Sequence, residues 1–452
     1  MFKIKTRLAL VMACVPVFGM TSVHADEREF IGTKYTPWGA ELQGNAEGTI
    51  PAFSGPPAVP ASYDASKPGV RPDPFADDKP LFSITSGNMG EYADKLSEGI
   101  KEMFRKHPEF RMDIYPSRRT ASYPDFYLEN ARKNLDSCKI TNDGLGLSGC
   151  YAGTPFPFPK SGTEVMRNRF FKYEQLSLSS SGMYGIVVDR SGRERITGVA
   201  QQELYWPIFD PQRTEPIGED DIFQYQRNDY VEPVRMNGEK NVIHDTVNTG
   251  LRAWQYLPGQ RRVKLAPDIS YDSPSPIGGG IAVVDELSLF YGAIDRYDFD
   301  LKGKQEMFIP YNSYKLNDAA QCSHAVANTP GYINPDCVRW ELHRVWKVEA
   351  NLKDGFRHIY PKRVMFLDED LWGTGISDNY DASGSVYRLT ISFPITLYEA
   401  SGHATDETVT YDMPTGAYHR SQTTVMSGGY TITTPKPVRY FNPQSLGGTG
   451  IR

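Results

Sequence analysis

Three consecutive carboxylates, Asp368-Glu369-Asp370, are the residues best suited by type and spacing to acid–base chemistry or cation binding. Neighbouring carboxyl groups can divide the roles of general acid and general base. Calcium-binding loops carry a glycine and further acids at regular spacing, and this turn carries neither. The favoured interpretation is a solvated turn with local side-chain-to-backbone bonds, and a catalytic pair, Asp368 and Asp370, is the alternative.

Histidines and short motifs give no stronger indication of catalysis. His343 and His358 flank a predicted hairpin, where a cross-strand polar pair is favoured over metal ligation. No G-x-S-x-G elbow, phosphate-binding loop or H-E-x-x-H zinc motif occurs. The sequence therefore predicts a protein that is not an enzyme, with no cofactor and no metal.

A strand of alternating character, AWQYL, precedes a break at Pro258-Gly259. Trp254 and Tyr256 share strand parity, so their side chains must point to one face of a sheet. That face is either the core of a packed sandwich or the wall of an apolar cavity. The residues predicted to line such a cavity are Trp254, Tyr256, Trp206, Trp346, Phe366, Leu96 and Met103.

Three basic residues follow the break, and we call Arg261, Arg262 and Lys264 the rim cluster. The favoured interpretation places them at the rim or outer face of a barrel, solvated or paired with Asp295 or Asp298. The alternative ligand for them is the head group of an anionic lipid.

Cysteines outside the N-terminal segment fall into two local pairs within turn-rich loops. Three connectivities are possible, and local pairing is favoured: Cys138 with Cys150 and Cys322 with Cys337. A zinc site is the competitor, but Cys322-Ser323-His324 is one residue too tight for the usual ligand spacing.

The N-terminus predicts export. Three basic residues precede the apolar run 8–20, and Val23-His24-Ala25 supplies a small-residue cleavage site, so residues 1–25 are predicted to be a signal peptide cleaved near Ala25. Lipidation of Cys14 is a less favoured alternative. The formal net charge of −6 argues against a nucleic-acid partner.

The elements that would position these residues are mostly strands. Residues 26–78 are rich in Pro and Gly and predict an extended segment, and 79–452 predict one β-rich domain with a helical lid in its N-terminal part. Apolar spacing predicts helices over 86–108 and 124–135. Beyond about residue 165, alternating runs with turns near Asn237-Gly238 and Ala382-Ser383-Gly384 predict an antiparallel meander. The predicted fold is mainly β: a large curved antiparallel sheet or incomplete β-barrel covered by helices.

Several blocks resemble the domain-of-unknown-function 1329 (DUF1329) family, among them YTPWGAELQGNAEGTIPAFSG, GLRAWQYLPGQRRVKLAP and FLDEDLWGTGISDNYDASGSVYR. The resemblance implies a fold related to the periplasmic lipoprotein carriers LolA and LolB, which enclose an apolar cavity. It also implies partners, an exporter of the resistance-nodulation-division (RND) type and an outer-membrane protein.

These features together predict a periplasmic carrier or accessory protein for a hydrophobic small molecule or lipid, with peripheral or transient membrane contact. The alternatives are a periplasmic enzyme acting on envelope lipid or polysaccharide and a ligand-free structural subunit of an export complex.

Overall fold

The computed structural model describes residues 27–218, 220–248, 250–267 and 269–448. The predicted signal peptide, residues 1–25, and Cys14 lie outside these ranges. Within the described residues, no helix combines the length and the apolar character that crossing a membrane requires.

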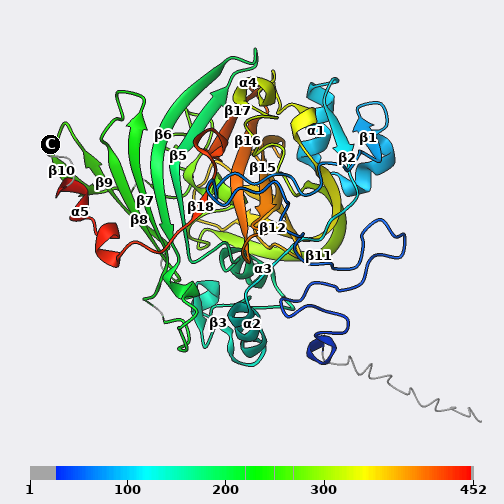
Figure 1. The fold of residues 1–452 in the computed structure, drawn as a ribbon, viewed down its shortest axis with the longest axis horizontal. Coiled ribbons are helices and arrows are strands. Elements are labelled where there is room, and N and C mark those ends of the chain that lie inside the picture. Colours follow the sequence, from blue (N-terminus) through cyan, green and yellow to red (C-terminus); the bar gives the residue numbers. More distant parts are fainter. Residues whose placement is uncertain (1–26, 219, 249, 268, 449–452) are drawn as a thin grey trace, which may run out of the picture.

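One large open sheet forms the body of the protein (Figure 1). Its strands are β1 (Phe82–Thr85), β2 (Arg111–Ile114), β5 (Ser177–Val188), β6 (Glu194–Tyr205), β7 (Ile222–Glu232), β8 (Lys240–Thr246), β9 (Gly250–Leu257), β10 (Arg262–Leu265), β11 (Tyr297–Pro310), β12 (Trp340–Leu352), β13 (Lys362–Asp368), β14 (Gly375–Tyr380), β15 (Val386–Thr396), β16 (His403–Asp412), β17 (Ala417–Thr423) and β18 (Thr431–Ile432). A separate hairpin consists of β3 (Lys139–Thr141) and β4 (Gly146–Ser148). The helices are α1 (Glu98–Lys106), α2 (Asp125–Ser137), α3 (Gly162–Phe170), α4 (His324–Ala327) and α5 (Ser445–Gly448).

The strand order is β1-β2-β12-β13-β14-β15-β16-β17-β5-β6-β7-β8-β9-β10, with β11 beside β12 and β18 beside β5. Two meanders, β5 to β10 and β12 to β17, therefore meet where β17 pairs with β5. Every ladder is antiparallel except the single contact between β2 and β12, and the path does not close on itself. The prediction of a mainly β protein built on a large curved sheet is confirmed.

The two predicted helices differ in outcome. The second is present as α2, whereas the first is split into a 3₁₀ helix, Met89–Lys95, and α1. The break follows from the cap: Ser97 has extended backbone, its hydroxyl accepts the Ile100 N–H at 3.2 Å, and it donates to Asp378 at 2.8 Å. Leu96 is therefore extended, and α1 packs on β14 and β15.

Tight turns lie where turn residues predicted them. Gly238 (φ +83°) lies between β7 and β8, and Gly384 (φ +81°) lies between β14 and β15, where left-handed backbone favours glycine. Both local disulfides, Cys138–Cys150 and Cys322–Cys337, are present, which confirms the predicted pairing. These sulfurs are therefore not available as zinc ligands.

A substitution at Leu96 tests this packing. Leu96 is 5% exposed within the main apolar core, so Leu96→Asp would bury an unpaired carboxylate. We expect a loss of several kcal/mol (about 3 or more) in the free energy of unfolding, measured by chemical denaturation. Leu81→Asp is the matched control, because Leu81 is 65% exposed. Equal stability of the two variants would contradict this packing of Leu96.

Candidate ligand-binding cavity

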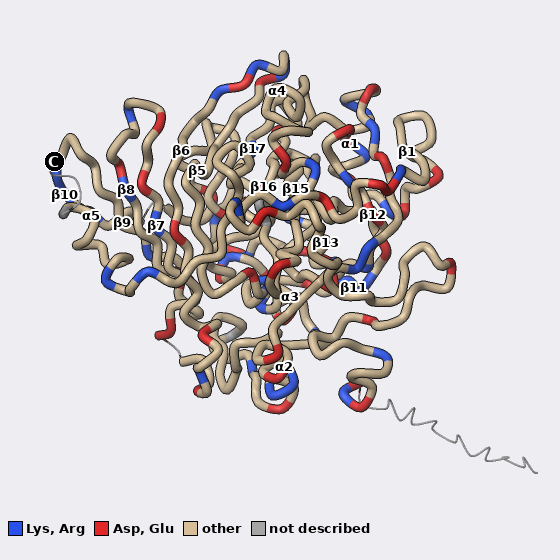
Figure 2. Tube along the Cα trace, in the orientation of Figure 1, with Lys and Arg blue, Asp and Glu red and all other residues tan. Residues whose placement is uncertain are grey.

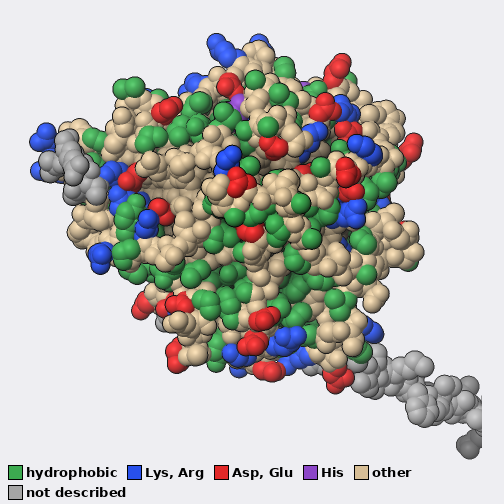
Figure 3. Space-filling view, viewed as in Figure 1, with side chains coloured by type: hydrophobic (Ala, Val, Ile, Leu, Met, Phe, Trp, Pro, Cys, Tyr) green, Lys and Arg blue, Asp and Glu red, His purple; other side chains and the backbone are tan. Residues whose placement is uncertain are grey.

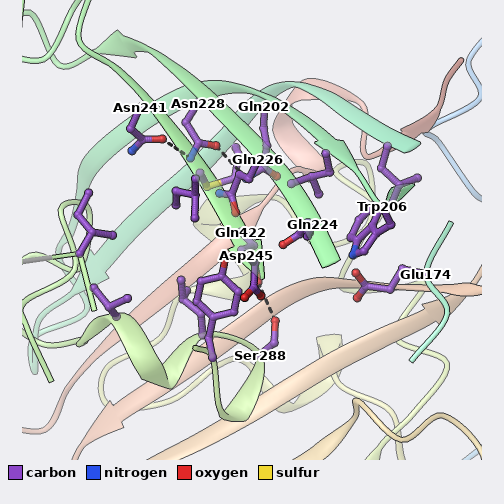
Figure 4. A pocket seen from close by; sticks show the side chains of 18 of the residues that line it. Glu174, Gln202, Trp206, Gln224, Gln226, Asn228, Asn241, Asp245, Ser288 and Gln422 are labelled. Atoms are coloured by element: carbon purple, nitrogen blue, oxygen red, sulfur yellow. Dashed lines mark hydrogen bonds between the residues drawn. The ribbon is translucent and has the colours of Figure 1, made fainter. Parts of the chain in front are cut away.

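A cavity lies on one face of strands β5 to β8, and we call it the β5–β8 cavity (Figure 4). Strand alternation builds its wall, since every second residue of three neighbouring strands points inward. These residues are Gln202, Leu204, Gln224, Gln226, Asn228, Tyr230, Asn241, Ile243 and Asp245. The empty space within this hollow is about 1190 Å³, open solvent at the mouth included.

The segment 269–291 covers part of this cavity and contributes Ile269, Ile277, Leu287 and Tyr291 to its lining. A notch made by two cross-strand glycines, Gly185 and Gly198, holds the segment in place. A Cβ at either position would lie within 3 Å of Ile277, so only glycine leaves room for that side chain. The Thr197 hydroxyl also donates to the Ile277 carbonyl.

Three amide side chains cross the cavity wall as a connected ladder. Gln202 donates to Asn228 at 3.0 Å, and Asn228 donates to Asn241 at 2.8 Å (Figure 4). Tyrosine hydroxyls terminate it, because Asn241 donates to Tyr230 at 3.2 Å and Tyr430 donates to Gln202 at 2.5 Å. Paired in this way, the amides satisfy one another without a ligand, so the wall can face either water or an apolar chain.

Charged groups gather at one end of the cavity, where it meets a second hollow that shares Phe170, Phe223 and Asp245 with it. Burial raises the pKa of Asp245 to about 7, against the opposing effect of Arg169 and Arg167. Burial likewise lowers the pKa of each of these arginines to about 10. Both remain cationic at neutral pH.

Of the residues predicted to line a cavity, Trp206 lines the β5–β8 cavity and the others do not. Trp254 and Tyr256 share one face, as parity requires, but it is the opposite face of the sheet, where they pack with Val242 and Leu446. The C-terminal segment covers part of this face, so apolar side chains are packed on both sides of β8 and β9. Alternation therefore could not indicate which side is hollow.

The remaining predicted lining residues are also corrected. Leu96, Met103 and Phe366 lie in the main apolar core. Trp346 is half-buried and stacks on Trp372 with ring centroids 6.2 Å apart. None of them contributes to the β5–β8 cavity.

The rim cluster is exposed, around the blue-coloured chain at β10 in Figure 2. Within the described residues, no ion pair joins Arg261, Arg262 or Lys264 to Asp295 or Asp298, and Asp295 instead accepts the Tyr271 hydroxyl. The solvated interpretation fits this placement. The face seen in Figure 3 intersperses acidic and basic side chains and carries no basic stripe of the nucleic-acid-binding kind.

The acidic turn is buried, which corrects its interpretation as a solvated loop. Arg119 binds both oxygens of Asp370 at 2.8 and 2.9 Å, and Glu369 accepts Lys304 at 2.7 Å. Asp368 accepts the backbone N–H groups of Asp370 and Leu371 through one oxygen. Cationic partners distant in the sequence make burial of Glu369 and Asp370 tolerable, and a local pattern cannot show them.

The two histidines do not face each other, contrary to the predicted cross-strand pair. His343 contacts Glu341 at 3.0 Å and stacks on Tyr311, whereas His358 contacts Asp285 at 2.9 Å. His343, Asp368 and Asp370 offer ligand atoms within 4.8 Å of one another. Asp370 also belongs to an ion-pair network within the fold, since Arg119 donates to both of its oxygens.

The amides of the cavity were missed, although one signal for them is present in the sequence. In IFQYQRNDYVE, Gln224, Gln226, Asn228 and Tyr230 alternate with the other face of β7. A row of amides on one strand face is unusual for a core and predicts a polar wall. The contribution of 269–291 and of α3 depends on tertiary packing and has no local signal.

A family model and a relative each match most of the chain. The model of the family described as "Protein of unknown function (DUF1329)" matches residues 83–447. The uncharacterized protein PA3922 of Pseudomonas aeruginosa is 35% identical over 424 residues, covering 91% of this chain and 90% of that protein.

Three solved structures are similar at lower levels. A Vibrio parahaemolyticus domain proposed to belong to an outer membrane lipoprotein-sorting protein has 14% identity and a TM-score of 0.43, covering 63% of this chain and 98% of that one. A DUF1329 family protein from Desulfovibrio piger has 14% identity and a TM-score of 0.39, covering 62% and 95%. The LolA superfamily protein NE2245 from Nitrosomonas europaea has 9% identity and a TM-score of 0.37, covering 63% and 98%.

Asp245 predicts a pH-dependent stability. Its pKa is about 7 in the folded protein against an ordinary 3.8, so the unfolded chain loses this proton first as pH rises. Stability therefore falls between about pH 4 and 7 on account of this group. Asp245→Asn should remove the loss, raising the free energy of unfolding at pH 8 by roughly 1–4 kcal/mol and by little near pH 4.

Chemical denaturation across this pH range measures the effect. Asp354→Asn is the control, because Asp354 lies in an exposed turn. A difference between Asp245→Asn and the wild type that does not change with pH would contradict the burial argument.

Proposed function

The chain belongs to the DUF1329 family, whose function is unknown, and from the cavity we propose that it is a periplasmic carrier that binds a hydrophobic, lipid-like ligand. The observation that carries the proposal is a hollow on a strand-built wall, covered by a docked segment. A rigid sheet with a separate covering segment lets a ligand enter without unfolding the core.

Apolar side chains supply the binding energy in this proposal. Leu178, Met183, Leu204, Trp206 and Phe223 form one side of the β5–β8 cavity. Removal of ligand surface from water contributes about 25 cal/mol per Å², so an acyl chain lying along them gains affinity without directional bonds. The amide ladder would contact a more polar part of the ligand.

The carboxylates considered for catalysis do not favour the enzymatic alternative. Asp368 and Asp370 are held in the buried ion-pair network and do not line the β5–β8 cavity. A substrate in that cavity would therefore not meet them. We propose binding without hydrolysis.

Delivery would require contact with a membrane or with envelope proteins. The turn between β7 and β8 presents Val234, 92% exposed, and it touches the β9–β10 turn through Gly238 and Pro258. An exposed apolar residue beside the rim cluster suits transient contact with an anionic membrane surface. The family resemblance supports an RND-type exporter and an outer-membrane protein as partners.

Tryptophan fluorescence tests the location of the ligand. An acyl probe that carries a quencher should reduce the tryptophan fluorescence of the wild type. Most of this quenching should be lost in Trp206→Phe, because Trp206 lines the cavity. Trp254→Phe should leave the quenching amplitude nearly unchanged, since Trp254 lies on the opposite face. Mass spectrometry of lipid extracted from the purified protein should also reveal a co-purified amphiphile. Saturable quenching that depends on Trp254 and not on Trp206 would overturn the assignment.

A further inference from the structure

Arg169 has a buried guanidinium that the described residues satisfy only in part. The side chain is 3% exposed, lines the β5–β8 cavity and donates through Nη2 to the Ser288 carbonyl. Its Nε has no hydrogen-bond partner among the described residues, and no carboxylate lies within ion-pair distance of it there. A buried cation with spare donors is costly unless an anion completes it.

The charges around Arg169 leave a positive excess. Lys172 and Glu174 pair with each other and cancel. Arg167 and Asp245 then remain with Arg169, which makes two cations against one carboxylate whose burial favours its neutral form. Arg167 is already tethered, since it donates to the Val247 and Gly144 carbonyls at 3.0 and 2.9 Å. The Arg167 Nε also lacks a partner among the described residues, but Arg167 does not line the β5–β8 cavity, so Arg169 is the arginine available to a ligand there.

A neighbouring hydroxyl is also unpaired at the same place. The buried Tyr291 hydroxyl lines the cavity and has no hydrogen-bond partner within the part of the chain that the structure describes. The arginine donors and this hydroxyl could bind separate oxygens of one carboxylate or phosphate group.

We propose that Arg169 binds the anionic head group, carboxylate or phosphate, of an amphiphile whose chain occupies the β5–β8 cavity. The inference rests on the proposed carrier function and adds the chemical class and the orientation of its ligand. The head group lies at the end shared with the second hollow, and the chain extends along Leu204 and Trp206. Arg167 adds positive potential, and Asp245 opposes the anion.

Matched probes test the proposal in titrations of the full-length mature protein below micellar concentrations. Dodecanoate and monododecyl phosphate are the anionic probes, dodecanol is the neutral one, and acetate and inorganic phosphate carry no chain. We expect Arg169→Gln to weaken the binding affinity for the anionic probes by about 10- to 100-fold and that for dodecanol by less than about threefold. Arg132→Gln, an exposed arginine on α2, is the control and should change neither.

A second variant keeps the test decisive if Arg169→Gln does not fold. Asp245→Asn removes the opposing carboxylate and should tighten dodecanoate binding severalfold without affecting dodecanol. Equal binding of anionic and neutral probes, unchanged in both variants, would overturn the head-group inference and leave the carrier intact. Failure of every chain-bearing probe to bind would overturn the carrier itself. Acetate or phosphate binding as tightly as the amphiphiles would indicate a free-anion site instead.

Discussion

The layout of the sheet depends on a buried ion pair between Arg119 and Asp370, residues 251 positions apart in sequence. Both side chains are about 1% exposed and share two parallel hydrogen bonds. Because an unpaired buried charge costs several kcal/mol, the N-terminal part of the chain cannot leave the β13–β14 turn without unfolding that end. Glu369 extends the constraint by contacting Lys304 of β11 and Arg344 of β12. These ion pairs therefore stabilise the packed core in the half of the sheet around β12 to β16.

The other half of the sheet borders a hollow, which the segment 269–291 and the end of α3 help to line. The segment 269–291 is held through Ile277 in the notch of Gly185 and Gly198. A side chain in a shaped notch gives a defined position, yet its removal exposes modest apolar area and leaves the strands of the wall intact. One half of the sheet thus supplies stability and the other supplies a space with a separable cover, which is the division that a reversible binder needs.

Local patterns predicted the elements of this architecture well. Alternation and turn residues identified the meanders, and cysteine spacing identified both disulfides. The layer that a strand face packs against was harder to predict. Strand parity requires that Trp254 and Tyr256 point to the same face, but it does not say what covers that face. Here the C-terminal segment packs on the face that carries Trp254, so an aromatic strand face indicated packing and not the cavity. The prediction that the acidic turn is solvated was wrong for a related reason. Arg119, which pairs with Asp370, lies too far away in the sequence for a local pattern to include it.

Affinity and orientation have separate physical sources in the β5–β8 cavity. The amide ladder is satisfied internally through Gln202, Asn228 and Asn241, so an empty cavity leaves few costly groups along the wall. Arg169 differs, since its Nε has no hydrogen-bond partner among the described residues. Apolar burial is non-directional and would let a ligand chain lie in either orientation. A guanidinium at one end of the cavity lowers the free energy of the orientation that places an anionic head group beside it. If the protein is the proposed carrier, apolar burial sets the affinity of its ligand and Arg169 sets the direction in which the ligand lies.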